Sequence, residues 1–314
     1  MLILCMDGHQ QLAEALSHSL EADILPLESR HFPDGEHYFN VPAEVKDEDV
    51  VVLCHLHQPN DKAMGLLFMA RHLKDMGAKR VGLVSPYLAY MRQDIRFQPG
   101  ECLTSKYFAE LISNVFDYLV TIDPHLHRYH HLNEIYSIPT RTLHATAIIG
   151  EYLHKLGEEN PDQKLLIVGP DEESEQWAKT VADAAGCDHL VLTKTRSGDR
   201  DVAIHIPDVE KYQQHLPVMV DDIISTGRTM LRTAEELKKQ GLNKPLCIGV
   251  HAVFADGAIE EMRAGPIADI RTCNCIPHDT NQIDIGYLLT PAILELILEC
   301  ETHITLPESE EDAS

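Results

Sequence analysis

Residues 216–231, LPVMVDDIISTGRTML, combine side-chain types whose order suits the binding of a phosphorylated sugar. An apolar run leads to two adjacent acids, Asp221 and Asp222, and a turn with hydroxyl groups precedes a helical pattern. Carboxylates that follow a strand accept hydrogen bonds from two vicinal sugar hydroxyls. Backbone N–H groups at a helix start, with Ser and Thr hydroxyls, bind phosphate. The alternative, a chance helix N-cap, explains the hydroxyl residues and leaves the two acids unexplained.

Five further segments carry charged, aromatic or metal-binding side chains. They are RHFPDGEHYF (30–39), PYLAYMRQDIRFQPGECLTSK (86–106), TIDPHLHRYHH (121–131), VGPDEESEQWAK (168–179) and LTKTRSGDRDVAIH (192–205). The first suits a nucleotide base, because Phe32 can stack on adenine while neighbouring acids accept hydrogen bonds. The last sets Lys194 and Arg196 two residues apart, so in an extended segment both point to one face.

Three of these segments also have simpler interpretations. Residues 30–39 fit a plain turn around Pro33 and Gly35. The histidines at positions 125, 127, 130 and 131 fit surface or hydrogen-bonded histidines as well as a transition-metal site. Residues 192–205 fit a solvated basic turn, although that interpretation does not explain why the cations follow an apolar strand directly.

Short apolar runs recur along the chain with amphipathic stretches between them, at residues 50–53, 80–84, 118–122, 164–168, 190–192, 218–220 and 246–250. Such runs are typical of parallel strands that helices cover on both faces. Two of the helices are legible, because residues 61–76 end at Gly77 and residues 229–240 end at Gly241. The sequence therefore predicts an α/β fold.

The pattern is duplicated along the chain. RVGLVSP near residue 80 and KLLIVGPD near residue 164 have similar positions in successive halves, which predicts two related α/β domains with a boundary at 143–150. Ligands of such sheets gather at the carboxyl ends of the strands, where most of the polar segments lie.

The formal charge of −24 argues against nucleic acid or an anionic membrane as the main partner. A small phosphorylated substrate remains compatible, provided that local Arg, Lys or a divalent cation offsets the acidic field. No apolar run is long enough for a spanning helix, and the N-terminus has no secretory pattern. The eight cysteines lack CxxC spacing and fit reduced core residues, Cys273 and Cys275 included. We therefore expect a soluble, cytoplasmic protein.

The six segments, in this order, resemble those of the ribose-phosphate diphosphokinase (phosphoribosyl pyrophosphate synthetase) family, of which this chain would be a divergent member. The 216–231 loop is also similar to that of type I phosphoribosyltransferases. The resemblance implies two tandem type I phosphoribosyltransferase-like domains, each a mainly parallel sheet flanked by helices. We expect an N-terminal domain at 1–146, a C-terminal domain at 147–304 and an acidic tail at 305–314.

The resemblance also implies roles for individual residues. The ribose hydroxyls would contact Asp221 and Asp222, and the 5-phosphate would contact Ser225, Thr226, Gly227, Arg228 and Thr229. ATP would be bound by Phe32, Asp34, Glu36, Arg92 and Gln93. Magnesium would be bound by His125 and Asp171, and the catalytic cations would be Lys194 and Arg196.

The implied reaction moves the β,γ-diphosphoryl group of ATP to the C1 hydroxyl of ribose 5-phosphate, with Mg²⁺ as cofactor. The implied assembly is a homo-oligomer, a hexamer built from dimers. Two alternatives remain open: a phosphoribosyltransferase, which shares the 216–231 loop, and a catalytically inactive regulatory homologue. The second draws on departures from the family pattern at Ile95, Leu126, Glu173, Ser174 and Thr195, to which Arg228 adds another.

Overall fold

The computed structural model describes residues 1–314 except 7, 127, 171–173, 198–200, 206–208 and 305–314, and it describes only the backbone of 193–197, 201–205 and 303–304. The described chain forms two compact units. The first comprises Met1–Leu143 and the C-terminal helix that begins at Gly286, and the second comprises His144–Ile285. The expected second domain, 147–304, differs from the second unit by this helix, because the helix packs on elements of the first unit.

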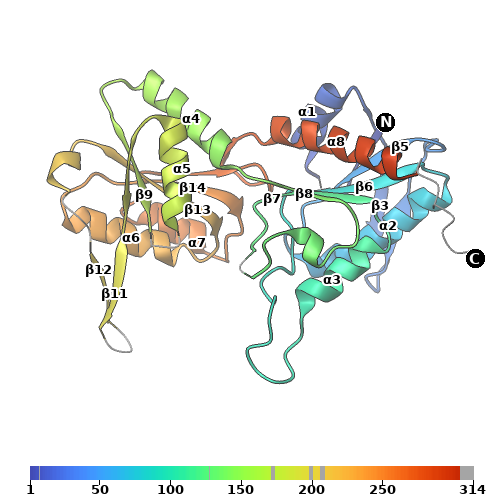
Figure 1. The fold of residues 1–314 in the computed structure, drawn as a ribbon, viewed down its shortest axis with the longest axis horizontal. Helices are drawn as coiled ribbons and strands as arrows, with labels where there is room; N and C mark the ends of the chain where they lie inside the picture. Colours follow the sequence, from blue (N-terminus) through green and yellow to red (C-terminus); the bar gives the residue numbers. More distant parts are fainter. Residues whose placement is uncertain (7, 127, 171–173, 198–200, 206–208, 305–314) are drawn as a thin grey trace, which may run out of the picture. The chain divides into compact units, whose positions relative to one another are not determined.

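The first unit is built on a six-stranded sheet in the order β2-β1-β5-β6-β7-β8, and every neighbouring pair is parallel. Its strands are β1 (Leu2–Cys5), β2 (Asp23–Ile24), β5 (Asp49–Leu53), β6 (Arg80–Ser85), β7 (Tyr118–Ile122) and β8 (Thr140–Leu143). Its helices are α1 (Gln10–Leu20), α2 (Ala63–Asp75), α3 (Thr104–Ser113) and α8 (Gly286–Ile304), with 3₁₀ turns at Pro59–Asp61 and Leu132–Glu134. Within this unit α1 and α8 cover one side of the sheet, and α2 and α3 cover the other (Figure 1).

Burial on both faces explains why the strands of the first unit read as continuous apolar runs. All residues of β6 and β7 are buried, and Val51, Leu83 and Leu119 are fully inaccessible. Arg80 is a charged exception to the apolar pattern of β6 and β7. Its guanidinium, 3% exposed, pairs with Asp49 at 2.5 Å and Glu301 of α8 at 2.8 Å, so the last helix also supplies charge to the buried end of a strand.

A short antiparallel hairpin lies outside the first sheet. It consists of β3 (Glu28–His31) and β4 (His37–Asn40), and it contains the predicted turn. The N–H of Gly35 donates to the carbonyl of Phe32 at 2.9 Å, and the N–H of Phe32 donates to the carbonyl of Glu36 at 2.8 Å. The hairpin packs on α2, because a β-carbon at Gly65 would be 2.8 Å from the ring of Phe39.

The second unit repeats the strand order of the first, position by position, as β10-β9-β13-β14-β15-β16, again with parallel neighbours. Its strands are β9 (Leu165–Gly169), β10 (Asp188–Val191), β13 (Leu216–Ile224), β14 (Leu246–Ala252), β15 (Asp269–Cys273) and β16 (Asn281–Ile283). Its helices are α4 (Thr146–Glu159), α5 (Glu175–Ala185), α6 (Arg228–Lys239) and α7 (Ala258–Ala264), with a 3₁₀ turn at Glu210–Tyr212. The antiparallel strands β11 (Thr193–Ser197) and β12 (Asp201–His205) form a separate hairpin.

The predicted fold class, α/β with two mainly parallel sheets flanked by helices, is confirmed. Helices α6 and α7 share a core with strands of the second sheet through Met230, Leu237 and Met262, while α4 and α5 pack on each other. None of the eight cysteines, all within the described residues, forms a disulfide. No helix among the described residues combines the length and the apolar character that crossing a bilayer requires.

Candidate active site

The predicted sugar-phosphate segment lies at the carboxyl end of β13. The strand runs further than the sequence predicts, because it continues through both acids to Ile224, with Asp221 opposite Gly249 of β14. Helix α6 then begins at Arg228, and Gly227 is its N-cap. The segment is therefore a strand, a three-residue turn and a helix start, which is the arrangement that exposes backbone N–H groups to a bound anion.

Neighbouring segments of the same unit hold this loop in place. Asp221 Oδ1 accepts a hydrogen bond from the N–H of Asp222 at 3.0 Å, which fixes one carboxylate against the strand. The carbonyl of Ser225 accepts a bond from the N–H of Ala255 at 3.2 Å, so the turn is tied to the chain that follows β14. The side chain of Met262 on α7 fills the space behind Gly227.

The side chains proposed to contact the ligand remain accessible. Asp221, Asp222 and Ser225 are partly exposed, and Thr226, Arg228 and Thr229 are exposed. The departure at Arg228 therefore leaves the interior of the loop open. Arg228 is the first residue of α6, so its charge is carried by the end of the helix at which a phosphate would bind.

In the first unit the turn between β3 and β4 presents Phe32, Asp34 and Glu36 together. Phe32 is 40% exposed, and the guanidinium of Arg30 lies 4.8 Å from its ring centroid. Asp34 Oδ1 accepts a hydrogen bond from the N–H of Glu36 at 3.3 Å. The turn thus offers an accessible aromatic face beside two exposed carboxylates, which suits a base and its polar groups.

Arg92 and Gln93 lie on the long segment between β6 and α3, and both are exposed. The carbonyl of Gln93 accepts bonds from the Oγ and the N–H of Ser105, at 3.0 and 3.4 Å, at the start of α3. The carboxylate of Glu101 accepts from the N–H groups of Phe97 and Gln98. These bonds give the segment a defined backbone although it has no regular secondary structure.

The structure brings this segment together with the one that follows β7. Arg128 Nη1 donates to Asp94 Oδ1 at 3.3 Å, and the hydroxyl of Tyr129 donates to the carbonyl of Asp94, also at 3.3 Å. Sequence analysis did not single out Asp94. The sequence shows Asp94 only as an acid between the cations Arg92 and Arg96. Its partner Arg128 is 34 residues away, so the sequence spacing could not indicate the contact.

His125 is partly buried, two residues after Asp123, which directly follows β7 and has a φ of 35°. Asp171 lies outside the described residues, and within them no group of three or more His, Cys, Asp or Glu side chains is placed to hold a metal ion. The backbone N–H groups of His130 and His131 donate to Glu134 Oε1 at 2.6 and 3.0 Å, and these bonds lower the pKa of that carboxyl. The main chain of these two histidines is thus engaged in a local turn.

Lys194 and Arg196 lie on β11, opposite Ile204 and Val202 of β12. They occupy alternate positions of the backbone of one strand. Their side chains are outside the description, and so is Glu173.

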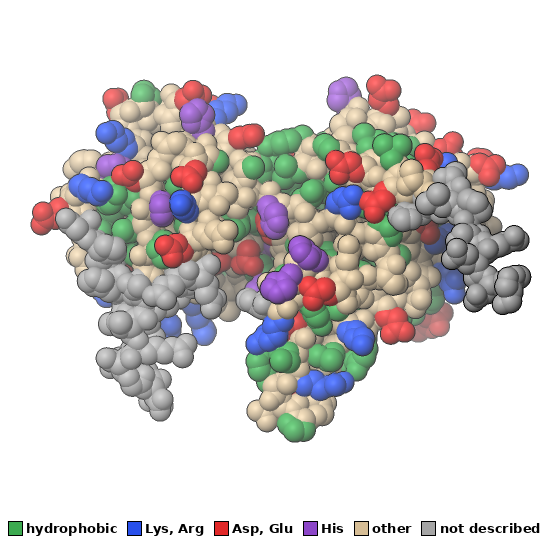
Figure 2. Space-filling model, viewed as in Figure 1, with side chains coloured by type: hydrophobic (Ala, Val, Ile, Leu, Met, Phe, Trp, Pro, Cys, Tyr) green, Lys and Arg blue, Asp and Glu red, His purple; other side chains and the backbone are tan. Residues whose placement is uncertain are grey.

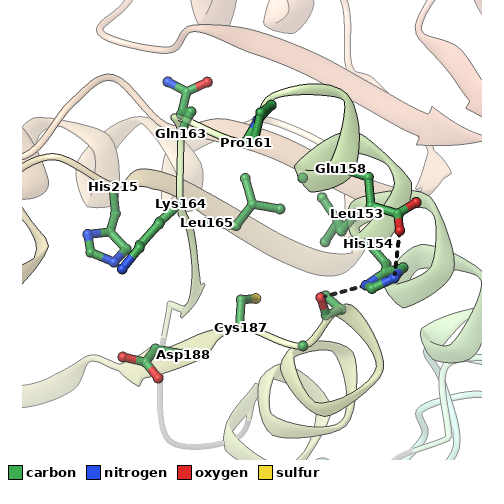
Figure 3. Close-up of a pocket in the computed structure, with 13 residues that line it drawn as sticks. Leu153, His154, Glu158, Pro161, Gln163, Lys164, Leu165, Cys187, Asp188 and His215 are labelled. Carbon is green, nitrogen blue, oxygen red and sulfur yellow. Dashed lines mark hydrogen bonds and ion pairs between the residues drawn. The ribbon is translucent and has the colours of Figure 1, made fainter.

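A cavity of about 500 Å³ opens at the amino ends of strands of the second sheet, beside the first residues of β9 and β10 (Figure 3). The β13–α6 loop lies at the carboxyl ends of the strands. His154, Lys164, Cys187 and His215 are among its lining residues. Burial raises the pKa of Cys187 to about 11, which leaves a weakly nucleophilic thiol. No residue predicted to bind substrate lines this cavity, so we do not assign the active site to it.

Comparison with known proteins places the chain in a family. A family model described as the N-terminal domain of ribose phosphate pyrophosphokinase matches residues 1–115, and one described as a phosphoribosyl transferase domain matches residues 131–288. Ribose-phosphate pyrophosphokinase of Methanobrevibacter smithii is 30% identical over 91% of this chain and 97% of its own. That of Methanopyrus kandleri is 31% identical over 94% and 99%. The chain belongs to the ribose-phosphate pyrophosphokinase family.

A solved structure shares the fold of this family member. The crystal structure of phosphoribosylpyrophosphate synthetase from Mycobacterium smegmatis matches with a TM-score of 0.79 and 24% identity, and it covers 95% of this chain and 99% of its own. The predicted family, fold class and enzyme class, a transferase, are confirmed.

Proposed function

We propose that this chain transfers the β,γ-diphosphoryl group of ATP to ribose 5-phosphate, giving 5-phosphoribosyl 1-diphosphate and AMP. The C1 oxygen of the sugar attacks the β-phosphorus and loses its proton. The bond between the β-phosphorus and the oxygen that bridges to the α-phosphorus breaks, and AMP leaves with that oxygen. The β13–α6 loop, in which an acid pair, a hydroxyl-rich turn and a helix start follow one another, supports the sugar-phosphate part of this proposal. The match of residues 1–115 to the N-terminal domain of ribose phosphate pyrophosphokinase favours it over a phosphoribosyltransferase.

The loop is proposed to bind ribose 5-phosphate through two kinds of contact. Asp221 and Asp222 accept hydrogen bonds from the 2- and 3-hydroxyls, which their partly exposed carboxylates can reach. The turn from Ser225 to Thr229 takes the 5-phosphate through hydroxyls and the N–H groups of the first helical turn. Binding at both ends fixes the C1 hydroxyl, and such positioning supplies much of the rate in phosphoryl-type transfer.

Residues of the first unit are proposed to bind ATP. Phe32 stacks on adenine, and Asp34 and Glu36 accept hydrogen bonds from the amino group or the ribose. Arg92 pairs with phosphate through its planar fork, and Gln93 lies beside it. All five side chains are exposed, so a nucleotide can reach them.

Mg²⁺ is the proposed cofactor, with His125 and Asp171 as the candidate protein ligands. Mg²⁺ uses few protein ligands and completes its shell with water and substrate phosphates, so the proposal needs no larger cluster of protein ligands. When bound, Mg²⁺ would offset phosphate charge in a chain whose formal charge is −24.

Lys194 and Arg196 are proposed to stabilise the charge that develops on the transferring group. A cation whose best contact forms in the transition state affects turnover more than substrate affinity. The Lys194→Ala variant should therefore lose turnover while the dissociation constants of both substrates stay close to those of the wild type. Equal losses in affinity with unchanged turnover would contradict this role.

We also propose a cytoplasmic homo-oligomer, with a hexamer as the expected form. Exposed apolar side chains on α2 and α3 support self-association, since Met64, Phe68, Tyr107 and Leu111 are between 45% and 56% exposed. Light scattering of the purified protein measures the assembly directly, and a monomer at assay concentration would contradict it.

The decisive assay incubates the purified protein with Mg²⁺, ATP and ribose 5-phosphate and follows AMP. A phosphoribosyltransferase would leave ATP intact and release pyrophosphate from 5-phosphoribosyl 1-diphosphate and a base, and an inactive homologue would do neither. The Asp222→Asn variant should raise the KM for ribose 5-phosphate at least tenfold. Its matched control is Asp188→Asn, which should behave as wild type. Asp188 is an exposed acid of the same unit and the first residue of β10, at the amino ends of the strands.

A further inference from the structure

Asp94 is a buried acid within an exposed segment. Its side chain is 3% exposed, although Arg92, Gln93 and Ile95 around it are exposed. Oδ1 accepts the bond from Arg128, and Oδ2 is buried with no hydrogen-bond partner among the described residues. Leaving a buried carboxylate oxygen unsatisfied is costly, so the fold retains Asp94 at the expense of stability. A buried, partly unsatisfied carboxylate of this kind suits a role in orienting a neighbouring side chain.

The side chain that the Asp94 carboxylate orients is Arg128. The guanidinium comes from the segment after β7, is 45% exposed, and lies 5.0 Å from the ring centroid of Phe97. A stacked ring on one side and Asp94 on another restrict its direction. Asp94 takes a single N–H of the five that the guanidinium offers, and an exposed, oriented fork of donors suits phosphate oxygens.

The other arginine nearby is already engaged in the segment's own structure. Arg96 Nε donates to the carbonyl of Glu101 at 2.8 Å, and Nη2 donates to the hydroxyl of Tyr107 at 3.2 Å. Its donors therefore hold the tip of the segment, while Arg128 reaches the segment from elsewhere in the chain. Arg96 is thus a structural arginine, and it provides a matched control for Arg128.

Positive charge gathers on this part of the first unit. Figure 2 shows Lys and Arg side chains on the segment that hangs beside α3 in Figure 1, whereas acidic and basic side chains are mixed over the rest of this face. In a chain with a formal charge of −24, such a cluster favours a ligand with several negative charges.

We propose that Arg128 binds the polyphosphate of the nucleotide next to Arg92, and that Asp94 is the positioning residue that directs it. This inference rests on the proposed function, because it assigns the ligand as ATP. When Asp94 accepts through both oxygens, the pair becomes bidentate and the remaining N–H groups of Arg128 stay directed at the phosphates.

The test measures equilibrium binding of Mg-ATP by calorimetry, without ribose 5-phosphate. Arg128→Gln should weaken Mg-ATP binding at least tenfold, about 1.4 kcal/mol. Arg128→Lys should recover only part of that loss, because an ammonium lacks the planar fork. Arg96→Gln should bind Mg-ATP within threefold of the wild type. The KM for ribose 5-phosphate should change less than twofold in all three variants.

Asp94→Asn distinguishes positioning from a separate role in folding. If Asp94 acts through Arg128, it should weaken Mg-ATP binding on its own but add little to Arg128→Gln in the double variant. Additive losses would contradict the positioning role. Thermal unfolding of each variant checks the fold, and Arg128→Gln alone carries the test if Asp94→Asn does not fold.

The outcomes separate this inference from the proposed function. Equal Mg-ATP affinity of the wild type and Arg128→Gln overturns the assignment of Arg128, whatever the turnover. Wild-type protein that binds Mg-ATP through Arg128 but forms no AMP with ribose 5-phosphate overturns the proposed function and supports the assignment. Equal loss of both substrates in Arg128→Gln also contradicts a specific nucleotide contact.

Discussion

Gly227 lies against Met262 so closely that a β-carbon at Gly227 would be 2.3 Å from Sδ and 2.6 Å from Cγ. Met262 is fully buried in α7, so its side chain has little space into which to move. Gly227 also has a φ of 67°, in the left-handed region that favours glycine. Steric contact and backbone conformation thus both require glycine at the turn between β13 and α6.

Gly227→Ala should therefore lower stability and weaken binding of ribose 5-phosphate. The left-handed backbone alone costs about 1–3 kcal/mol for a residue with a β-carbon, and the contact with Met262 adds to that cost. Urea unfolding measures the stability, and calorimetry with ribose 5-phosphate measures the binding. Adding Met262→Ala removes the contact but not the backbone strain, so the double variant should lose less than the two single losses combined. Wild-type stability of Gly227→Ala would contradict both reasons.

Two other glycines predict opposite effects of the same substitution. A β-carbon at Gly82 of β6 would be 1.9 Å from Cζ of Tyr118, which is 1% exposed on β7. At Gly157 of α4 it would be 3.9 Å from Cδ1 of Leu165, an ordinary contact. Gly82→Ala should destabilise by about 1–3 kcal/mol or more, and Gly157→Ala should stabilise by roughly 0.5–1 kcal/mol. Denaturant unfolding compares them, and equal stability of the two variants would refute the steric argument.

His55 should make stability depend on pH. The residue is 7% exposed, and burial, with Lys62 as a further cause, lowers its pKa from 6.5 to about 3. Between those values the unfolded chain binds a proton at His55 and the folded chain does not. The contribution is therefore fully present above pH 6.5 and is lost as pH falls toward 3.

His55→Gln should remove this part of the pH dependence. The wild type should lose roughly 2 kcal/mol more than the variant between pH 7 and pH 5, since one pKa unit corresponds to about 1.36 kcal/mol. Urea unfolding at pH 7, 6 and 5 gives the two slopes. Parallel slopes would show that His55 titrates alike in the folded and unfolded chains.

The sequence predicted most of the interior strands, because their apolar runs are continuous. Residues 50–53, 118–122 and 246–250 all fall within β5, β7 and β14, which helices cover on both faces. The edge strands β8 and β16, TRTL and NQI, were missed, because short polar segments that pair on one side carry no such pattern. The interior strands β1 and β15 were also missed, and the edge strand β10 was predicted in part by the run at 190–192, so the local pattern does not separate interior strands from edge strands.

Placement in the fold was harder to predict than secondary structure. The sequence did not indicate that the helix from Gly286 packs in the first unit, because an apolar helix face fits either sheet. The contact between Asp94 and Arg128 also depends on tertiary structure, since the two residues belong to segments that follow different strands. The acid pair at 221–222 was found because its whole setting, strand, turn and helix, is local in sequence.

The return of α8 to the first unit sets the order in which the chain can be completed during synthesis. Helix α8 packs on α1 and β8, yet the ribosome makes it after the entire second unit. One side of the first sheet therefore remains incompletely covered until synthesis reaches α8. The second unit is continuous and has no such delay. We therefore expect the part of the chain made first to be the part that finishes folding last, which makes it the region where chaperones have most to protect.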